Sequence, residues 1–400
     1  MMGERTAMQV ALFHGFSLER HVPGDHLLRK IDRFVDLSGV RAHLEPDYSE
    51  VGRPSIDPEL MIRMLIVGYC LGVRSERRLC DEVHLNLAYR WFCRLGLDGD
   101  VPDHSTFSKN RHGRFRDSDV LRKLFETVVA RCMREGLVSG EAFAVDASLI
   151  VADAHRRRGV AKVEDLNPTS NRAVAEYLAV LDDAAFGGAT PVAPKAISPT
   201  DPAARYTAAA DAPAVYAYSD NDLIDVERAV IMDVEATTAV RQAEVGAAKT
   251  MFDGAADQFD ARPSRLIADA GYGSAEMLGW LVEERGIEPH VKVFDKSERT
   301  DGTFSRSDFA YDPQAELYLC PGGKELRKRR RLFSALRSEV TKEGVILYRA
   351  SKRDCEVCAL KPKCTPNMPA RKIARSVHEA ARDKARAIAK TEAYVVSRRQ

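Results

Sequence analysis

The segment Ala142–Val151, with the sequence AFAVDASLIV, is a short apolar run interrupted by one acid, Asp146. Its length and its apolar and β-branched residues predict a strand rather than a helix. A second segment, Arg265–Gly273 or RLIADAGYG, has the same character, since an apolar run reaches Asp269 directly before a glycine turn. The two segments predict two strands of a sheet, each with one acid.

An acid kept within an apolar strand needs a partner, because an unpaired buried carboxylate costs several kcal/mol. A divalent cation is the functional candidate, since Mg²⁺ prefers carboxylate oxygens. The alternative is structural, with each aspartate capping the turn that follows it, Asp269 before Gly271 in particular. The spacing alone leaves both interpretations of Asp146 and Asp269 open.

The rest of the chain predicts an α+β or α/β protein with two parts. Helical periodicity runs through residues 25–135, where Asp57 and Pro58 are typical of a helix start and Gly136 of a helix end. Beyond it, further strands are expected at 228–238 and 287–294 with a helix at 274–285 between them. Strands alternating with helices indicate an α/β layer.

These patterns predict an all-helical domain over 1–138 and a second domain over 139–400. Residues 189–215 hold five Pro and ten Ala without an apolar period, so we expect a loop at about 160–215. A basic, cysteine-bearing insert is expected at about 310–370. The stretch 218–225, YSDNDLID, is acidic and is expected only to lead into a strand.

The formal net charge is +1, from 60 Lys+Arg and 59 Asp+Glu, but it is unevenly distributed. Residues 201–320 hold 11 Lys+Arg and 23 Asp+Glu (net −12), and residues 321–400 hold 22 and 8 (net +14). A basic module of this kind is suited to nucleic acid. The apolar stretch from Leu60 to Val73 contains Arg63 and is shorter than a membrane span, so no membrane partner is expected. The cysteine pattern is not that of a small secreted disulfide scaffold, so a reduced, cytoplasmic protein is expected.

Four of the eight cysteines cluster late in the chain and supply enough soft ligands for a tetrahedral zinc ion. Reduced cysteines without a metal and an iron–sulfur cluster are the alternatives. The four candidate zinc ligands are Cys320, Cys355, Cys358 and Cys364.

Two basic strips are candidate DNA contacts, because phosphate contacts dominate affinity for nucleic acid. A solvated surface is the plain alternative for each. The candidates are Lys109, Arg111, Arg114 and Arg116 in the first strip, and Lys324, Arg327, Lys328, Arg329, Arg330 and Arg331 in the second.

In combination, six segments resemble bacterial insertion-sequence transposases of the DDE class, over about residues 10–400. They are RPSIDPELMIRMLIVGY (53–69), VPDHSTFSKNRHGRF (101–115), FAVDASLI (143–150), LIADAGYGS (266–274), YLCPGGKEL (318–326) and CEVCALKPKC (355–364).

The resemblance implies an RNase H-like mixed-sheet core in which Asp146 and Asp269 are catalytic ligands of Mg²⁺ (or Mn²⁺). It implies double-stranded DNA partners, namely element ends and target, a homodimer on DNA, and a cytoplasmic, nucleoid-associated protein. Its third acid, a Glu on a basic helix after the cysteine segment, is expected beyond Gln400, so residues 1–400 alone are expected to be inactive. The alternative function is that of a truncated transposase that only binds specific DNA.

Overall fold

The computed structural model describes residues 15–49, 51, 55–116, 118–180, 196–208, 213–295, 299–328, 338–341 and 344–399. The chain divides into two compact units, Met1–Leu137 and Val138–Gln400, which are described separately.

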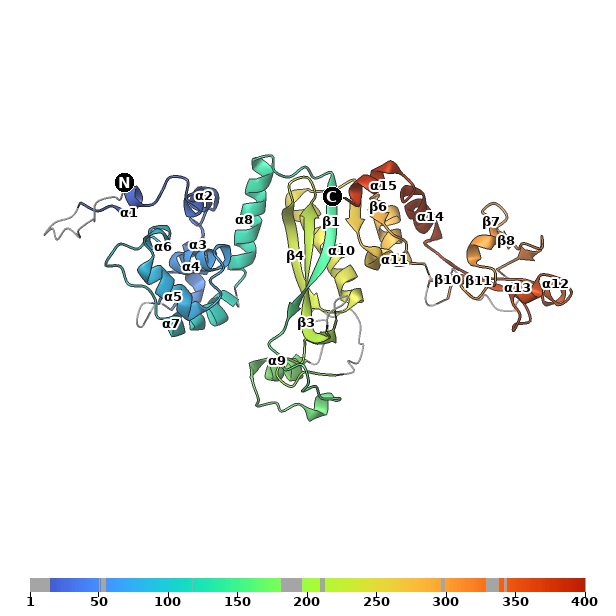
Figure 1. Ribbon diagram of the computed structural model, residues 1–400, viewed down its shortest axis with the longest axis horizontal. Helices are drawn as coiled ribbons and strands as arrows, with labels where there is room; N and C mark the ends of the chain where they lie inside the picture. Colours follow the sequence, from blue (N-terminus) through green and yellow to red (C-terminus); the bar gives the residue numbers. More distant parts are fainter. Residues whose placement is uncertain are drawn as a thin grey trace, which may run out of the picture. The chain divides into compact units, whose positions relative to one another are not determined.

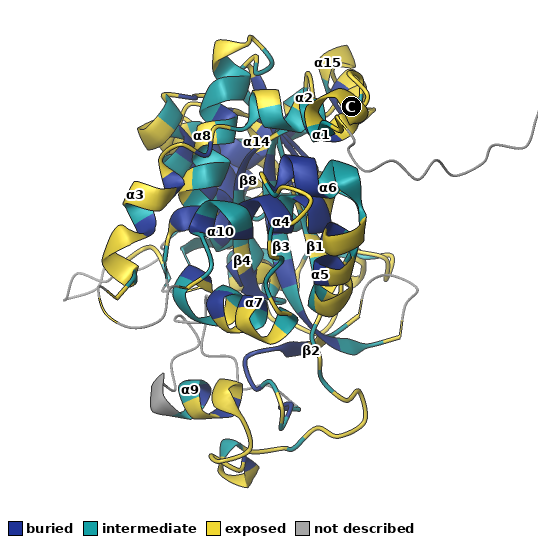
Figure 2. Ribbon diagram, turned by 90° about the vertical axis from the view of Figure 1, so that its left-hand side faces the viewer, coloured by how far each residue is buried: buried dark blue, intermediate teal, exposed yellow. Residues whose placement is uncertain are grey.

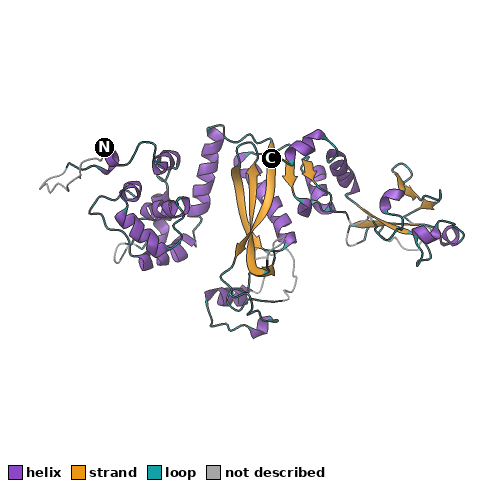
Figure 3. Cartoon of the chain, viewed as in Figure 1, coloured by secondary structure: helices purple, strands orange, loops and turns teal. Residues whose placement is uncertain are grey.

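The first unit, hereafter the helical unit, contains only helices and helical turns among its described regular elements, as the sequence predicts (Figure 3). Its helices are α1 (Leu18–His21), α2 (Leu27–Phe34), α3 (Val40–Leu44), α4 (Pro58–Cys70), α5 (Glu76–Leu85), α6 (Leu87–Phe92), α7 (His104–Asn110) and α8 (Val120–Arg134). A 3₁₀ turn follows α3 at Glu45–Asp47, and a π turn follows α7 at Arg111–Phe115.

Helix α4 forms the centre of the helical unit's core (Figure 2). It begins as predicted, since the Asp57 carboxylate accepts a hydrogen bond from Glu59 N at 2.8 Å and Pro58 occupies the first turn. Arg63, which interrupts its apolar sequence, is buried and donates from Nη1 to Asp32 Oδ1 at 2.8 Å. The charge is thus paired inside the core rather than turned to solvent.

The second unit, hereafter the α/β unit, is built on one mixed sheet of six strands (Figure 1). The strands are β1 (Ala142–Val151), β2 (Arg205–Thr207), β3 (Val215–Asp225), β4 (Val230–Thr238), β5 (Arg265–Ala268) and β6 (Glu288–Val291). Its helices are α9 (Arg172–Val180), α10 (Arg241–Phe259) and α11 (Ala275–Gly279), which continues as a π turn through Trp280–Glu284. A 3₁₀ turn, Ala270–Tyr272, follows β5.

Strand β1 pairs with antiparallel β3 on one edge and with parallel β5 on the other. Strand β6 extends the parallel side, while β4 and the short β2 pair with the far edge of β3. The Phe143 ring of β1 lies 6.0 Å from that of Phe252 on α10, which in turn lies 5.9 Å from Trp280. This aromatic contact series is part of the packing of α10 and the π turn against the sheet.

Strand β3 is the main departure from the sequence-based expectation, since 218–225 forms most of this long strand rather than a lead-in. Its burial alternates with period two, and Ser219, Asn221 and Asp225 are among its buried residues. Each buried polar side chain has hydrogen bonds, such as Ser219 Oγ to Glu244 Oε1 at 2.8 Å and Asn221 Nδ2 to Glu235 O at 2.7 Å. The strand was hard to recognise because its buried face mixes the polar Ser219, Asn221 and Asp225 with Ala217 and Leu223.

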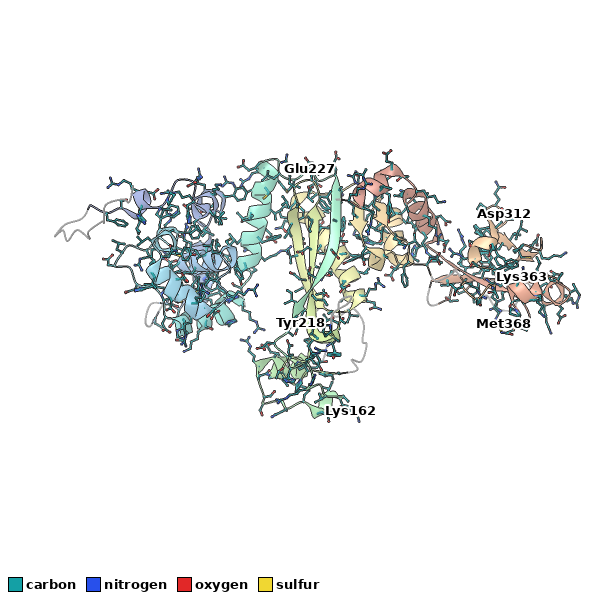
Figure 4. The ribbon with its side chains drawn as sticks, viewed as in Figure 1. Lys162, Tyr218, Glu227, Asp312, Lys363 and Met368 are labelled. Carbon is teal, nitrogen blue, oxygen red and sulfur yellow. The ribbon has the colours of Figure 1, made fainter. Side chains whose placement is uncertain are left out.

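The stretch expected as a loop at about 160–215 contains structure of its own, since helix α9 and strand β2 lie in it. A small cluster of buried residues joins the parts on either side of α9, namely Leu166, Val174, Tyr177, Ile197 and Ala203. Tyr218 of β3 packs on this cluster and donates from its hydroxyl to Asp201 Oδ1 at 2.6 Å (Figure 4).

The cysteine-bearing insert follows β6 and carries two small sheets, β7–β8–β9 and β10–β11. Its strands are β7 (Ala310–Asp312), β8 (Leu317–Leu319), β9 (Glu325–Leu326), β10 (Val345–Arg349) and β11 (Lys372–Ser376), with helices α12 (Lys352–Glu356) and α13 (Lys361–Cys364). Asp312, Lys363 and Met368 mark it in Figure 4. The chain then returns through α14 (Glu379–Ile388), which contacts α11 and β6, to α15 (Glu392–Ser397).

A buried carboxylate anchors α14 where the insert ends. Glu379, only 1% exposed, accepts hydrogen bonds from Arg306 Nη2 (2.7 Å), Arg382 Nη1 and Arg386 Nη1. Burial alone raises the pKa of Glu379, but the three arginines lower it below its usual value. The insert is therefore tied to α14 through a charge pair as well as through the chain.

No helix among the described residues is both long enough and apolar enough to cross a membrane.

Asp225 at the end of β3 should be a structural rather than a catalytic acid. It is fully buried, and its carboxylate accepts hydrogen bonds from Ser139 N (3.1 Å), Gly140 N (2.8 Å) and Glu227 N (3.1 Å). Asp225→Ala leaves these donors unsatisfied and should lower the free energy of unfolding by about 1–3 kcal/mol. Urea titration followed by Trp280 fluorescence, in a Trp91→Phe background, measures the change in the α/β unit.

The matched control is Asp257→Ala on the exposed side of α10, which should change stability by less than about 0.5 kcal/mol. Equal effects of the two substitutions would contradict the structural role of Asp225.

Candidate functional site

Asp146 lies in the central strand and is exposed. Its Oδ1 accepts a hydrogen bond from the following backbone, Ala147 N, at 2.8 Å. Its antiparallel partner in the register with β3 is Asp222, so the two acids are directly opposite one another and point to the same face of the sheet.

Asp269 directly follows β5 and is also exposed. It is the N-cap of the 3₁₀ turn, and its Oδ1 accepts a hydrogen bond from Gly271 N at 2.6 Å. A Cβ at Gly271 would lie 2.6 Å from Asp269 Oδ1 and 2.8 Å from Arg241 Nη2, which explains why the turn has a glycine there. Asp269 therefore does cap the turn, as the structural interpretation expected, but the cap uses only one of its two carboxylate oxygens.

The pairing of β1 with β5 brings the two aspartates to one part of the sheet. Ala144 pairs with Ile267, and Asp146 and Asp269 each lie two residues further along these parallel neighbours. Tyr272 is buried beside them. Burial raises the pKa of Tyr272, and the charges of Glu244, Asp146 and Asp269 raise it further. The Tyr272 hydroxyl has no hydrogen-bond partner among the described residues.

The cost of burying a carboxylate, which the sequence suggested as a reason for a metal, does not apply to these two acids. Asp146 and Asp269 are exposed, so neither carboxylate carries the desolvation cost that an apolar strand suggested. In the described part of the chain, no three His, Cys, Asp or Glu side chains are grouped so that they could hold a metal ion. The two aspartates remain a pair of hard oxygen donors on adjacent strands.

Sequence reasoning missed three residues at this site. Asp222 lies in the stretch 218–225, which was expected only to lead into a strand, and neither Glu244 nor Arg241 was predicted. The alternation of acids at Asp220 and Asp222 was the available signal, because residues two apart share a face of a strand. Glu244 and Arg241 come from the first turn of α10, and only the packing of that helix brings them to the aspartates.

Repulsion among the acids should make stability depend on pH through Asp222. Burial raises the pKa of Asp222 above its usual 3.8, and Asp220 and Asp146 raise it further. A raised folded-state pKa means that the contribution of Asp222 to stability is greatest at low pH and is lost as pH rises through that pKa. Asp222→Asn should therefore stabilise the protein at pH 7, by no more than about 1 kcal/mol because Asp222 is partly exposed.

Thermal unfolding from pH 7 down to pH 4 measures this, with Asp257→Asn as the control. The gain from Asp222→Asn should shrink as pH falls. A gain that is constant over this range would show that its cause is not the carboxylate charge.

The four candidate zinc ligands come together in the insert. Cys320 lies at the β8–β9 turn, Cys355 in α12 and Cys364 at the end of α13, and with Cys358 they line one small cavity. All are free thiols. The pKa of Cys364 is raised by burial first, lowered by Arg371, and raised by the other three cysteines.

The first basic strip is largely engaged within the helical unit. Arg111 donates to Glu76 Oε1 at 2.9 Å and to the Tyr69 hydroxyl at 2.7 Å. Arg114 donates to Asn110 Oδ1 at 2.6 Å and stacks on the Tyr48 ring. Arg116 is not a free side chain either. Lys109 is exposed and makes no ion pair with any described residue.

The second strip is only partly described. Arg327 pairs with Glu325 at 2.7 Å, and Lys328 pairs with Glu316 at 2.7 Å, while Lys324 is exposed. Arg329, Arg330 and Arg331 lie outside the described residues.

A solved structure and a family model are similar to parts of this chain. The structure, titled "Cryo-EM structure of piggyBac transposase synaptic complex with hairpin DNA", aligns with 92% of this chain and 64% of its own at 10% identity. Its TM-score of 0.28 is too low to carry an argument about fold, and this chain spans less than two thirds of its length. The family model, described as "Transposase domain (DUF772)", matches residues 16–113, so this part of the helical unit is similar to a transposase domain.

Proposed function

We propose that this protein is a DNA transposase of an insertion element, which binds the terminal inverted repeats and carries out metal-dependent strand cleavage and strand transfer. One combination of observations carries the proposal. Residues 16–113 match a transposase domain, and the other unit presents two exposed acids from neighbouring parallel strands, Asp146 and Asp269.

The proposal includes an RNase H-like core for the α/β unit. Its support is the strand arrangement, in which β3 pairs antiparallel with central β1 and β4 antiparallel with β3 on one side, and β5 and β6 run parallel to β1 on the other. Helix α10 connects the antiparallel part to the parallel part. The first acid is then on the central strand and the second at the end of its parallel neighbour.

In this proposal, Asp146 and Asp269 hold Mg²⁺ or Mn²⁺. The donor chemistry fits, because both side chains are exposed carboxylates and hard cations prefer such oxygens. A bound cation would also offset the repulsion between Asp146 and Asp222, which face each other across the β1–β3 pair. When bound, divalent ions clamp the attacking and leaving oxygens of an in-line phosphoryl displacement.

The chain's own residues orient the two carboxylates. The backbone N–H of Ala147 fixes one oxygen of Asp146, and that of Gly271 fixes one oxygen of Asp269. The Arg241 guanidinium next to Gly271 adds positive charge beside the second acid. Two element ends must be held together for transposition, so we propose a homodimer on DNA.

A second candidate function is sequence-specific DNA binding without cleavage. It is favoured by the absence, among the described residues, of a third acid grouped with Asp146 and Asp269 as a metal site. In that case the helical unit would occupy inverted repeats while the sheet lacked a complete metal site.

The test uses the product of the complete reading frame, with residues 1–400 alone beside it, and labelled duplexes from the DNA on either side of the coding sequence, with and without Mg²⁺. A transposase should bind these duplexes and cut them only with Mg²⁺, and should join pre-cut ends to a target. Asp146→Asn and Asp269→Asn should each lower the cleavage rate by at least about 100-fold, while DNA affinity stays within about twofold. The control, Asp257→Asn, should cut as the wild type does.

The outcomes separate the candidates. Specific binding without Mg²⁺-dependent cleavage supports the second function, and cleavage without joining indicates a nuclease. Loss of binding in the aspartate variants would contradict the role given to these acids, and a wild type that binds no flanking duplex would contradict both functions.

Among the predicted basic contacts in the helical unit, Lys109 should have a measurable effect on DNA affinity. It is exposed and unpaired among the described residues, whereas Arg111 is held by Glu76. Lys109→Ala should weaken binding to all duplexes alike and reduce the slope of log K against log salt by about 1. Fluorescence anisotropy at several salt concentrations measures this, with Lys30→Ala on α2 as the control, and an unchanged slope in Lys109→Ala would exclude the phosphate contact.

A further inference from the structure

The cavity at the centre of the insert is lined by cysteines from two separate stretches of chain. Cys320 comes from the turn between β8 and β9, and the others from α12, α13 and the turn between them. A Cβ built on Gly322 would lie 3.7 Å from both Cys320 Sγ and Cys358 Sγ. The fold thus brings thiols nearly forty residues apart in sequence to the same small space.

The turn that carries Cys320 is shaped around its sulfur atom. Lys324 N donates to Cys320 Sγ at 3.3 Å, while Gly323 N donates to Cys320 O at 2.8 Å. Gly323 has a φ of +72°, which glycine adopts without strain. Backbone N–H groups aimed at a cysteine sulfur stabilise its thiolate, the form that binds metals.

An unsatisfied cation provides a second, independent indication. Arg371 lines the same cavity, is only 6% exposed, and donates from Nη1 to Cys364 O at 2.9 Å and from Nη2 to Phe304 O at 2.8 Å. Its Nε is buried and has no hydrogen-bond partner among the described residues. Asp301 and Asp308 already act electrostatically on this guanidinium, but the unused N–H still lacks an acceptor, and a polar group buried without a partner is costly.

We propose that this cavity binds one structural zinc ion through four thiolates, those of Cys320, Cys355, Cys358 and Cys364. Four thiolates and one Zn²⁺ carry a net charge of −2, and Arg371 balances part of it from beside the site. Because the protein supplies all four ligands, the ion is structural. Its role is to join the β8–β9 turn to α12 and α13 in an insert whose buried core is small.

The cavity is small, with a volume of about 30 Å³, which is room for only a few water-sized spheres and suits a single ion. The side chains do not yet stand in coordinating positions, since no three candidate ligands among the described residues form a metal-holding group. Binding therefore rotates the cysteine side chains toward the cavity that they already line.

The test is the metal content of the purified, dialysed 400-residue chain, measured by mass spectrometry of the elements. The wild type should contain about one zinc per chain. Cys355→Ser with Cys358→Ser should contain none, whereas the control, Cys70→Ser with Cys132→Ser in the helical unit, should retain it. A wild type without zinc, or stoichiometric iron and sulfide in its place, would overturn the proposal.

Two further measurements test the site even if the variant with both Cys355→Ser and Cys358→Ser does not fold. Cobalt added to metal-free wild type should give the intense thiolate-to-cobalt absorption of four sulfur ligands, and its absence would also overturn the site. Arg371→Gln should weaken zinc binding by about tenfold or more in chelator competition, compared with Arg353→Gln on the exposed side of α12. Equal affinities would refute the role of Arg371, and none of these readouts depends on the transposase proposal.

Discussion

The hydrogen bonding of β1 to β3 on one edge and to β5 on the other is the constraint on which the candidate site depends. The antiparallel register places Asp222 opposite Asp146, and the parallel register brings Asp269 to the end of the adjacent strand. A shift of either register by one residue would turn one of these acids to the other face of the sheet. The buried neighbours Phe143 and Val145 fix the register, because they must remain in the core.

Strands β1 and β3 carry acids in two different environments. Asp225 is fully buried and is satisfied by backbone N–H groups, so it stabilises the start of β1. Asp146 and Asp222 face each other with few donors, and burial and repulsion raise the pKa of Asp222. The first arrangement is complete within the protein, whereas the second gains from an added cation. This difference is the physical reason for proposing a metal at Asp146 and Asp269 and not at Asp225.

The insert depends on polar and ionic contacts more than on its core. Six buried residues form its cluster, and the bond from Arg306 to Glu379 ties the insert to the following helix, α14, where Arg382 and Arg386 also bind Glu379. Arg371 is held by two carbonyl groups but keeps a buried N–H without an acceptor. A tetrathiolate zinc site would add negative charge beside this N–H and a cross-link at the same place.

The sequence by itself determined the helical unit, strand β1 and the position of Asp269 at a strand end, because these depend on local signals. Caps such as Asp57 and the apolar runs around Asp146 act over a few residues. Only the tertiary structure decided that β3 is a strand, since its buried face carries Ser219, Asn221 and Asp225, and the hydrogen-bond partners of the first two lie in α10 and β4. It also decided that the two aspartates are exposed and that Asp222, Glu244 and Arg371 belong to candidate sites. Burial and long-range pairing are properties of the packed chain, and no local pattern encodes them.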